Sequence, residues 1–358
     1  MSSHSSEKGH HHHHHRHSIW YRMHRWIRHN KKFAVAAALL CVAVLSAGGF
    51  FLLYSHKEQS RFHVTAGNSV DMKGGYRTLT YQGKEYQYNS LITTVLYAGL
   101  DSTDPLKASE TYSNKARADS VSVVILDKKK KKMSILALNR DTMTEIRRYT
   151  RTGEDMGTYV SHLGYAYSYG DGGEVSCEDL KEAVENLLGI PIDEYAVTNQ
   201  SSITSINDLV GGVTVTVPND DLASMYPELK TGAVVTLDDS NVKDFLQHRD
   251  TAVDFSNEGR IERQQAYVTA YVDLLKKRLN SESDQVWQEI SQMDDYLQTS
   301  ITKNKYLSLA NLLEKVSFSD ADYYRPTGED SLGELHDEFY VDEDALQQLV
   351  VDLFYEEI

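Results

Sequence analysis

The middle of the chain alternates short apolar runs with turn-forming and amphipathic stretches. Leu91–Leu100, Val121–Leu126 and Met133–Leu138 are apolar runs of strand length. The last two are separated by a lysine run, Lys128–Lys132, which predicts a hairpin with a solvated turn. A polyanion site at these lysines is the less favoured interpretation.

An amphipathic helix is predicted over Ser176–Leu188, with Ser176 as its cap, Asp179 at capping-box spacing and Gly189 at its end. Further strands are expected at Pro191–Thr198 and Val213–Val217, and further helices at Gly259–Asn280, Val286–Val316 and Asp342–Tyr355. Strands that alternate with helices predict an α/β fold with a sheet between helical layers.

Residues 33–54 form an uncharged apolar stretch of 22 residues. This length suffices to cross the hydrocarbon core of a bilayer, so we expect one transmembrane helix; a signal peptide is the alternative. The basic residues on its N-terminal side predict a cytoplasmic N-terminus and an extracytoplasmic remainder. The sequence thus predicts five parts: a basic, His-rich tail (1–32), the membrane span (33–54), a stalk (55–88), a core domain (89–280) and C-terminal helices that complete or extend it (281–358).

Charge is distributed unevenly along the chain. The net charge is −15, and residues 1–32 hold seven Lys/Arg and one Glu, or +6, which leaves −15 − 6 = −21 for the rest. Such an acidic domain excludes non-specific nucleic-acid binding, and any anion site must be built from a few clustered arginines. Cys41 lies in the apolar span and Cys177 outside it, so no internal disulfide is expected. The His10–His15 run is either a purification tag or a natural tail, and neither informs function.

Three polar features follow or precede the predicted strands, where ligands bind in open α/β sheets. Asp101 follows the first strand, Asp119 precedes the hairpin, and Arg140 with Asp141 follows it. A hairpin folded at its lysine turn brings its open ends together, so Asp119 and Arg140 should be neighbours. Paired aspartates beside arginine suit Mg²⁺ with a pyrophosphate. Taken singly, each aspartate is more often a turn residue or helix cap, and Arg140 could equally form a surface salt bridge.

A second basic group comprises Arg249, Arg260 and Arg263, with Gln264 beside them. Arg260 and Arg263 lie where the predicted 259–280 helix begins, and free backbone N–H groups there together with guanidinium groups can bind phosphate. Surface ion pairs with nearby acidic residues, Asp254, Glu258 and Glu262, are an equally good interpretation. No sequence motif of a serine hydrolase, P-loop or zinc site is present. His162 and His248 are the histidines near these motifs, and a lone histidine is more often structural than catalytic.

At this point the chain resembles the LytR-CpsA-Psr family. The resemblance covers roughly residues 90–279. It rests on the order of these pieces: the apolar anchor, Asp101, Arg117-Ala118-Asp119-Ser120, Leu138-Asn139-Arg140-Asp141-Thr142, Tyr165-Ala166-Tyr167-Ser168-Tyr169-Gly170, Leu187-Leu188-Gly189-Ile190-Pro191-Ile192-Asp193, Leu209-Val210-Gly211-Gly212-Val213 and Gly259-Arg260-Ile261-Glu262-Arg263-Gln264-Gln265.

The resemblance implies an α-β-α sandwich with a central mixed sheet, at the outer face of the plasma membrane of a Gram-positive cell. It implies a phosphotransferase that moves a glycopolymer from a polyprenyl-pyrophosphate carrier to a peptidoglycan hydroxyl. By position, Asp101 and Asp119 would hold Mg²⁺. Arg140, Arg249 and Arg260 would bind the pyrophosphate, with Gln264 and Arg263 beside them, and Asp141 is available for catalysis.

Three positions depart from the family pattern. Gln247 replaces the first arginine of an Arg-x-Arg pair, Asn257 replaces an aspartate, and His162 replaces a lysine. A non-enzymatic envelope protein of the same fold that binds lipid or polymer is therefore the alternative function, and hydrolysis of the carrier with water as acceptor is a further one. The polymer, the general base and the oligomeric state are not predicted by the sequence.

Overall fold

The computed structural model describes residues 70–73, 76–112, 116–249, 257–333 and 336–358. The chain divides into two compact units, 1–60 and 61–358, and the described residues all belong to the second. The predicted tail and the predicted membrane span (33–54) lie outside the described residues. Within the described ranges, no helix combines the length and the apolar composition that crossing a membrane requires.

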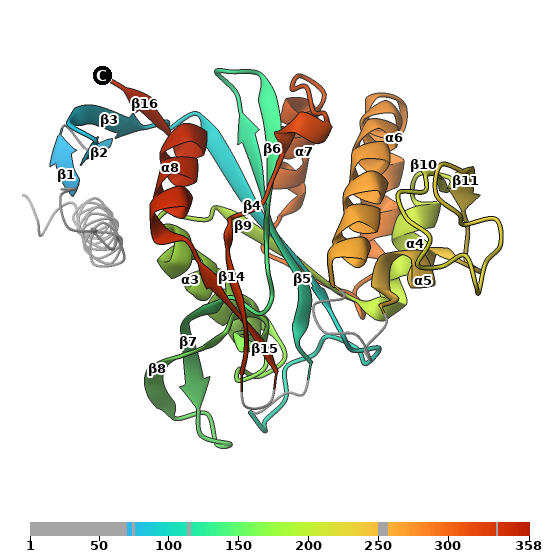
Figure 1. Ribbon diagram of the computed structural model, residues 1–358, viewed down its shortest axis with the longest axis horizontal. Coiled ribbons are helices and arrows are strands. Elements are labelled where there is room, and N and C mark those ends of the chain that lie inside the picture. The colour runs from blue at the N-terminus through green and yellow to red at the C-terminus, as the bar shows by residue number, and fades with distance from the viewer. Residues whose placement is uncertain (1–69, 74–75, 113–115, 250–256, 334–335) are drawn as a thin grey trace, which may run out of the picture. The chain divides into compact units, whose positions relative to one another are not determined.

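A six-stranded mixed sheet forms the centre of this unit, as the sequence predicted (Figure 1). Its order is β12-β9-β4-β5-β6-β13, with β4 antiparallel to β5 and parallel to β9. The bounds are β4 Ile92–Leu100, β5 Ala118–Asp127, β6 Lys132–Leu138, β9 Glu194–Asn199, β12 Leu297–Thr299 and β13 Tyr323–Tyr324. The predicted hairpin is β5 with β6, and two of the lysines at its turn pair with acidic side chains, Lys129 with Glu356 and Lys132 with Asp322.

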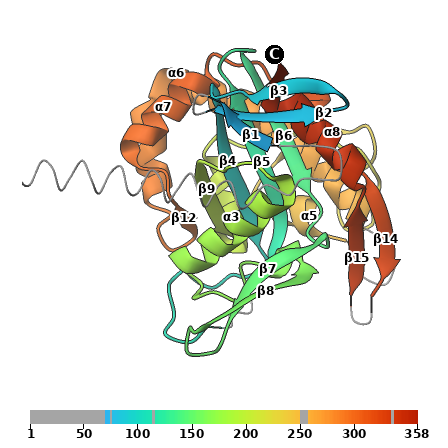
Figure 2. The same cartoon turned by 90° about the vertical axis from the view of Figure 1, so that its left-hand side faces the viewer.

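Helices cover both faces of this sheet. Side chains on successive strand residues point to opposite faces, so each strand supplies apolar side chains to both helical layers. Helices α3 (Glu174–Leu188) and α8 (Glu343–Phe354) cover one face, and α6 (Asn257–Ser291) with α7 (Lys303–Leu313) covers the other (Figures 1 and 2). On β5, Val123 packs in the core beneath α3 and α8, whereas Leu126 packs against the α6 and α7 side. The result is three layers, helix–sheet–helix, as predicted.

Helix α3 begins two residues before the predicted start, at Glu174, with Gly173 as its N-cap. Ser176 is inside the helix, and its hydroxyl accepts a hydrogen bond from the Gly172 N–H at 2.8 Å. The capping prediction for Ser176 and Asp179 was therefore wrong, since the hydroxyl holds the loop before the helix instead. The predicted end is confirmed: Gly189 adopts the left-handed conformation with φ of 65°.

The C-terminal helices differ in part from expectation. Helix α6 runs past the predicted end at Asn280 to Ser291, with a kink at Glu282. The expected helix over 286–316 is interrupted by β12, because that strand pairs with the edge strand β9. Helix α8 is capped by the Asp342 side chain, which accepts a hydrogen bond from the Ala345 N–H. Its apolar residues, Leu346, Val350, Val351, Leu353 and Phe354, enter the main core, so this segment packs with the core domain.

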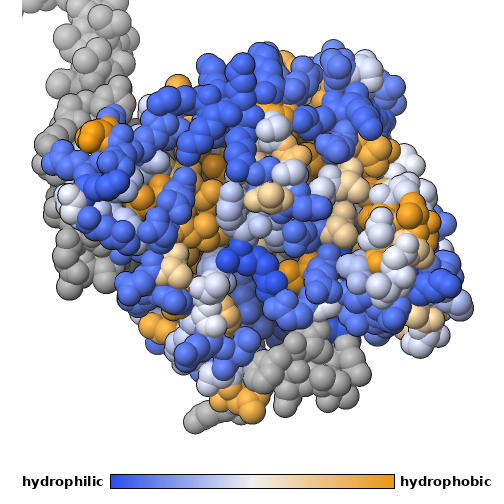
Figure 3. All heavy atoms as spheres, turned by 45° about the horizontal axis from the view of Figure 1, so that its top comes forward, coloured by the Kyte–Doolittle hydropathy of each residue, from blue (hydrophilic) through white to orange (hydrophobic). Residues whose placement is uncertain are grey.

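Shorter elements complete the unit. A second sheet has the order β1-β2-β3-β16, and three further strand pairs are separate. Their bounds are β1 Val70–Lys73, β2 Tyr76–Tyr81, β3 Lys84–Tyr88, β16 Tyr355–Glu357, β7 Met143–Tyr149, β8 Asp155–His162, β10 Val213–Thr216, β11 Val234–Leu237, β14 Gly328–Leu332 and β15 Asp337–Val341. The short helices are η1 Leu163–Tyr165, η2 Gln200–Ser202, α4 Ile203–Asp208, α5 Val242–Gln247 and η3 Asp320–Asp322. The face in Figure 3 is mostly hydrophilic, with hydrophobic residues in separate small areas.

Candidate functional site

Arginines from two parts of the chain face one carboxylate where β5 begins. The Arg140 Nη1 donates a hydrogen bond to the Asp119 Oδ1, and the Arg260 Nη1 lies 3.7 Å from the Asp119 Oδ2. The Arg140 Nε lies 3.4 Å from the Asp141 Oδ1. The expectation that the β5–β6 hairpin brings Asp119 and Arg140 together is confirmed. Arg260, from the first turn of α6, joins them.

A glycine fixes the position of the Arg140 backbone. The Gly164 N–H donates to the Arg140 carbonyl at 2.8 Å. A Cβ on Gly164 would lie 2.9 Å from the Ala118 carbonyl oxygen, closer than side chains come to backbone. Helix η1 can therefore pack directly on the ends of β5 and β6 only because residue 164 has no side chain.

The electrostatics of this cluster favour an anion. Arg260 is 4% exposed, and burial lowers the pKa of its guanidinium to about 10, although the Asp119 carboxylate opposes this shift. Arg140 and Arg249 lower the pKa of Arg260 further by like-charge repulsion. The Arg140 Nε is buried without a hydrogen bond to any described residue. Because the three cations outnumber the neighbouring Asp119 and Asp141 carboxylates, a phosphate placed there would relieve their repulsion.

Asp101 lies beside this cluster, held by an arginine that sequence reasoning missed. Its Oδ1 accepts from the Arg117 backbone N–H at 2.7 Å and its Oδ2 from the Arg117 Nε at 2.9 Å. The guanidinium of Arg117 also lies 5.8 Å from the centre of the Tyr165 ring. A signal for Arg117 existed, since it stands two residues before the predicted site residue Asp119.

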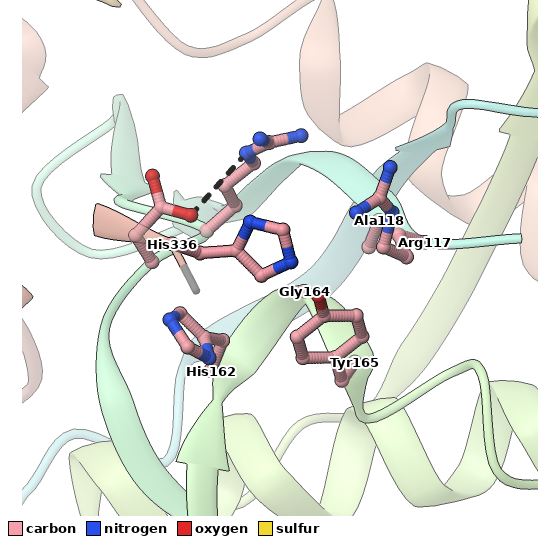
Figure 4. A pocket seen from close by; sticks show the side chains of 8 residues that line it. Arg117, Ala118, His162, Gly164, Tyr165 and His336 are labelled. Carbon is pink, nitrogen blue, oxygen red and sulfur yellow. Dashed lines mark ion pairs between the residues drawn. The ribbon is translucent and has the colours of Figure 1, made fainter. Parts of the chain in front are cut away.

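A small pocket of about 30 Å³ opens beside Arg140 (Figure 4). Its walls come from four parts of the chain, which are the start of β5, the segment after β6, helix η1 with the end of β8, and the segment before β15. Figure 4 shows the rings of His162, Tyr165 and His336 around this space. Its lining residues are Arg117, Ala118, Arg140, Asp141, His162, Gly164, Tyr165 and His336.

His336 reaches this pocket through the β14–β15 hairpin. The Phe339 N–H donates to the Asp141 carbonyl at 2.9 Å, which joins β15 to the site. The His336 ring centre lies 6.2 Å from that of His162 and 6.3 Å from that of Tyr165. The sequence around residue 336 could not have indicated that His336 lines this pocket, because its position depends on how the β14–β15 hairpin packs against the site.

A wider pocket of about 430 Å³ includes Asp101 in its lining. Carboxylates and hydroxyls line it, with Asp101, Ser102, Thr103, Asp104, Pro105, Leu106, Ala116 and Gly172 as its residues. This space has room for a larger polar ligand.

Arg263 and Gln264, which were predicted to bind phosphate, form hydrogen bonds to other parts of the protein. Arg263 is fully buried, and its Nε donates to the Phe245 carbonyl at 2.9 Å. Its Nη1 donates to the Asp221 Oδ2 at 2.5 Å and its Nη2 to the His248 carbonyl. The Gln264 Nε2 donates to the Leu246 carbonyl at 2.9 Å. To bind pyrophosphate, the Arg263 guanidinium would have to break these hydrogen bonds, so the structure does not favour that role. Because Arg263 is buried, it does not form the surface ion pair that was the alternative.

No group of three or more His, Cys, Asp or Glu side chains that could hold a metal occurs among the described residues. A Mg²⁺ ion, however, usually takes only one or two protein carboxylates and completes its shell with water and substrate phosphate. Asp101 and Asp119 offer two carboxylates at the paired ends of β4 and β5, and the oxygens of both face arginine groups in this structure.

Comparisons with known proteins agree with this architecture. The model of the LytR_cpsA_psr family matches residues 54–353. The polyisoprenyl-teichoic acid–peptidoglycan teichoic acid transferase TagV of Bacillus subtilis (strain 168) is 26% identical over 325 residues, which cover 88% of this chain and 75% of TagV. The transferase of the same description TagU from Bacillus anthracis (strain CDC 684 / NRRL 3495) is 36% identical over 110 residues, which cover 31% of this chain and 32% of TagU.

Solved structures share the fold. The crystal structure of B. subtilis TagV matches with a TM-score of 0.55 at 23% identity, covering 73% of this chain and 95% of that chain. A structure of TagT bound to LIIa-WTA matches with a TM-score of 0.54 at 21% identity, covering 74% of this chain and 90% of that chain. At these identities the likeness establishes the arrangement of sheet and helices.

Proposed function

This chain belongs to the LytR-CpsA-Psr family, and we propose on that premise that it transfers a glycopolymer from a polyprenyl-pyrophosphate carrier to a hydroxyl of peptidoglycan. The names of its relatives TagV and TagU, which are teichoic acid–peptidoglycan transferases, support this class of reaction. The observation that carries the proposal is the pairing of Arg140 and Arg260 with Asp119, with Arg249 close enough to Arg260 to lower its pKa. These arginines supply cations for a pyrophosphate in an otherwise acidic domain.

The arginines would act by binding and orienting the pyrophosphate. Phosphoryl transfer depends mainly on positioning and on neutralising charge at the phosphate oxygens. Arg140 and Arg260 already face a carboxylate, so the oxygens of a pyrophosphate can take up the same donors. Asp119 holds both guanidinium groups in place beforehand, which lowers the cost of ordering them at the moment of binding.

Asp101 and Asp119 would hold a Mg²⁺ ion, which supplies further charge neutralisation at the pyrophosphate. Arg117 would then give up part of its bond to Asp101, and its position over Tyr165 gives it a second partner. The predicted membrane span would place the domain at the outer face of the plasma membrane, in the same plane as the lipid carrier.

The test is a transfer assay with a short-chain polyprenyl-pyrophosphate glycan donor and peptidoglycan fragments, with Mg²⁺ and with a chelator. We expect the Arg140→Ala and Arg260→Ala variants to lose at least about 100-fold in transfer rate, the loss typical for one preorganised charge-stabilising donor. Arg151→Ala is the matched control, since that side chain is exposed on the loop between β7 and β8. Thermal unfolding of each variant confirms that it folds.

Wild-type protein that binds the donor yet transfers nothing would favour the alternative, a non-enzymatic envelope protein of this fold. Release of the free glycan phosphate without peptidoglycan would instead show hydrolysis with water as acceptor. Equal transfer by Arg140→Ala and Arg151→Ala would refute the assigned site.

A further inference from the structure

His162 lies at the end of β8, and its imidazole lines the small pocket together with Arg140 and Asp141. Figure 4 shows this ring at the pocket. The ring packs edge-on against Tyr165, with ring centres 5.4 Å apart. A neutral imidazole has one nitrogen that donates and one that accepts, so this position can receive a proton.

A hydrogen bond to the backbone determines which ring nitrogen of His162 carries the hydrogen. The His162 Nε2 lies 3.0 Å from the Asp337 carbonyl oxygen. A carbonyl oxygen only accepts, so Nε2 is the donor. In the neutral ring Nδ1 then holds the lone pair. Nδ1 makes no hydrogen bond to the described residues, and β15 thus orients this imidazole as a proton acceptor.

The pocket next to this imidazole is small and open to solvent. Its volume of about 30 Å³ has room for an oxygen the size of a water molecule. It can therefore admit the reacting hydroxyl of an acceptor. Arg140 lines the same pocket and binds Asp119, so an oxygen placed here is adjacent to one of the arginines assigned to the pyrophosphate.

We propose that His162 accepts the proton of the attacking hydroxyl, an inference that rests on the proposed transferase function. The acceptor oxygen forms a bond to the phosphorus that carries the glycopolymer, and the bond from that phosphorus to the bridging oxygen breaks. The hydroxyl proton passes to the His162 Nδ1, and polyprenyl phosphate leaves as the anion.

Asp141 is the competing base in this pocket, and its surroundings suit it less well. Its Oδ1 lies 3.4 Å from the Arg140 Nε, so the carboxylate is engaged with a cation. Other charged or titratable groups also face the pocket or the histidine from each adjoining element. They are Arg117 before β5, Arg140 and Asp141 after β6, Tyr165 in η1, and His336 and Asp337 at β15.

The experiment measures the pH dependence of transfer from pH 5 to 9 for wild type, His162→Gln and His162→Ala. A group that accepts the hydroxyl proton must be unprotonated, so wild type should lose activity on the acid side. We expect His162→Gln to fall about 100-fold or more in kcat, the usual contribution of a general base, to lose that acid limb, and to keep the donor KM within about threefold. Added imidazole should restore part of the activity of His162→Ala. His248→Gln is the matched control, since His248 does not line the pocket.

The outcomes separate the two proposals. If wild type transfers, Arg140→Ala fails and His162→Gln keeps both its rate and its acid limb, then His162 is not the proton acceptor while the transferase function stands. A rise in donor KM without a change in kcat would also overturn the assignment, because it would show a binding role. Absence of transfer by wild type would overturn both.

Discussion

Two arginines three residues apart at the start of α6 have different surroundings. Arg263 donates to two backbone carbonyls and to the Asp221 and Asn219 side chains, all of them parts of the protein. Arg260 faces Asp119 and lies close enough to Arg140 for their like charges to lower its pKa. The Arg263 guanidinium therefore stabilises the fold, whereas the Arg260 guanidinium lies in a site where a bound anion would offset the repulsion between arginines.

Replacing these two arginines should separate stability from activity. We expect Arg263→Met to lower the free energy of unfolding by about 3 kcal/mol, at the low end of the range for breaking a buried pair, because its partner Asp221 is 43% exposed. Arg260→Met should cost less, since it also removes like-charge repulsion, and should abolish transfer. Urea unfolding monitored by circular dichroism measures both. A larger loss for Arg260→Met would contradict these assignments.

The sequence predicted those parts of the site that depend on contacts within one hairpin or one helix. The contact between Asp119 and Arg140 follows from a hairpin whose lysine turn is visible in the sequence, and helix periodicity places Arg260 in the first turn of α6. The contacts of Arg263 depend on the α5 carbonyls and on Asp221, which only tertiary packing brings to it. Spacing alone could not distinguish the two.

At the scale of elements, α3 contains a buried acid where it packs on β7. Asp179 is 5% exposed, and its Oδ2 has no hydrogen-bond partner among the described residues. Burial raises the pKa of Asp179 to about 7, although the Tyr149 hydroxyl, which donates to its Oδ1 at 3.0 Å, opposes this shift. The helix thus favours the protonated carboxyl.

This acid should make the stability of the domain depend on pH. An unfolded aspartate loses its proton near pH 4, whereas folded Asp179 keeps it until about pH 7, so stability falls as pH rises between these values. Asp179→Asn should flatten this dependence and be more stable at pH 8, by at most about 4 kcal/mol at about 1.4 kcal/mol per pKa unit. Urea unfolding at pH 4.5, 6 and 8 tests this, and parallel profiles for both proteins would refute it.

The positions of β4, β5, β6 and α8 followed from periodicity, but the start of α3 did not. Ser176 and Asp179 match a capping pattern, yet Gly173 is the N-cap, and the Ser176 hydroxyl accepts a hydrogen bond from the Gly172 N–H. Likewise β12 interrupts a stretch of helical character because the edge of β9 offers backbone partners. In both cases, contacts with distant or flanking backbone outweighed the local preference.

At the scale of the whole molecule, charge is divided between a basic tail and an acidic remainder. Residues after 32 carry −15 − 6 = −21, whereas the substrate proposed for the site is anionic and lies in a membrane. Long-range electrostatics therefore oppose the encounter that the local arginine cluster is built to complete. The predicted membrane span would overcome this repulsion by fixing the domain next to the carrier.

Without the tail and the predicted span, electrostatic repulsion between the acidic domain and an anionic membrane should reduce transfer. For a protein comprising residues 55–358, we expect transfer from donor in anionic vesicles to fall at least about tenfold, while transfer from a detergent-soluble short-chain donor stays within about twofold. Raising ionic strength from about 10 to 150 mM shortens the screening length from about 30 to 8 Å. It should therefore raise the activity of the truncated protein on anionic vesicles but not on neutral ones. Activity on vesicles that is undiminished by truncation, or insensitive to both salt and lipid charge, would show that tethering does not serve to overcome the acidity of the domain.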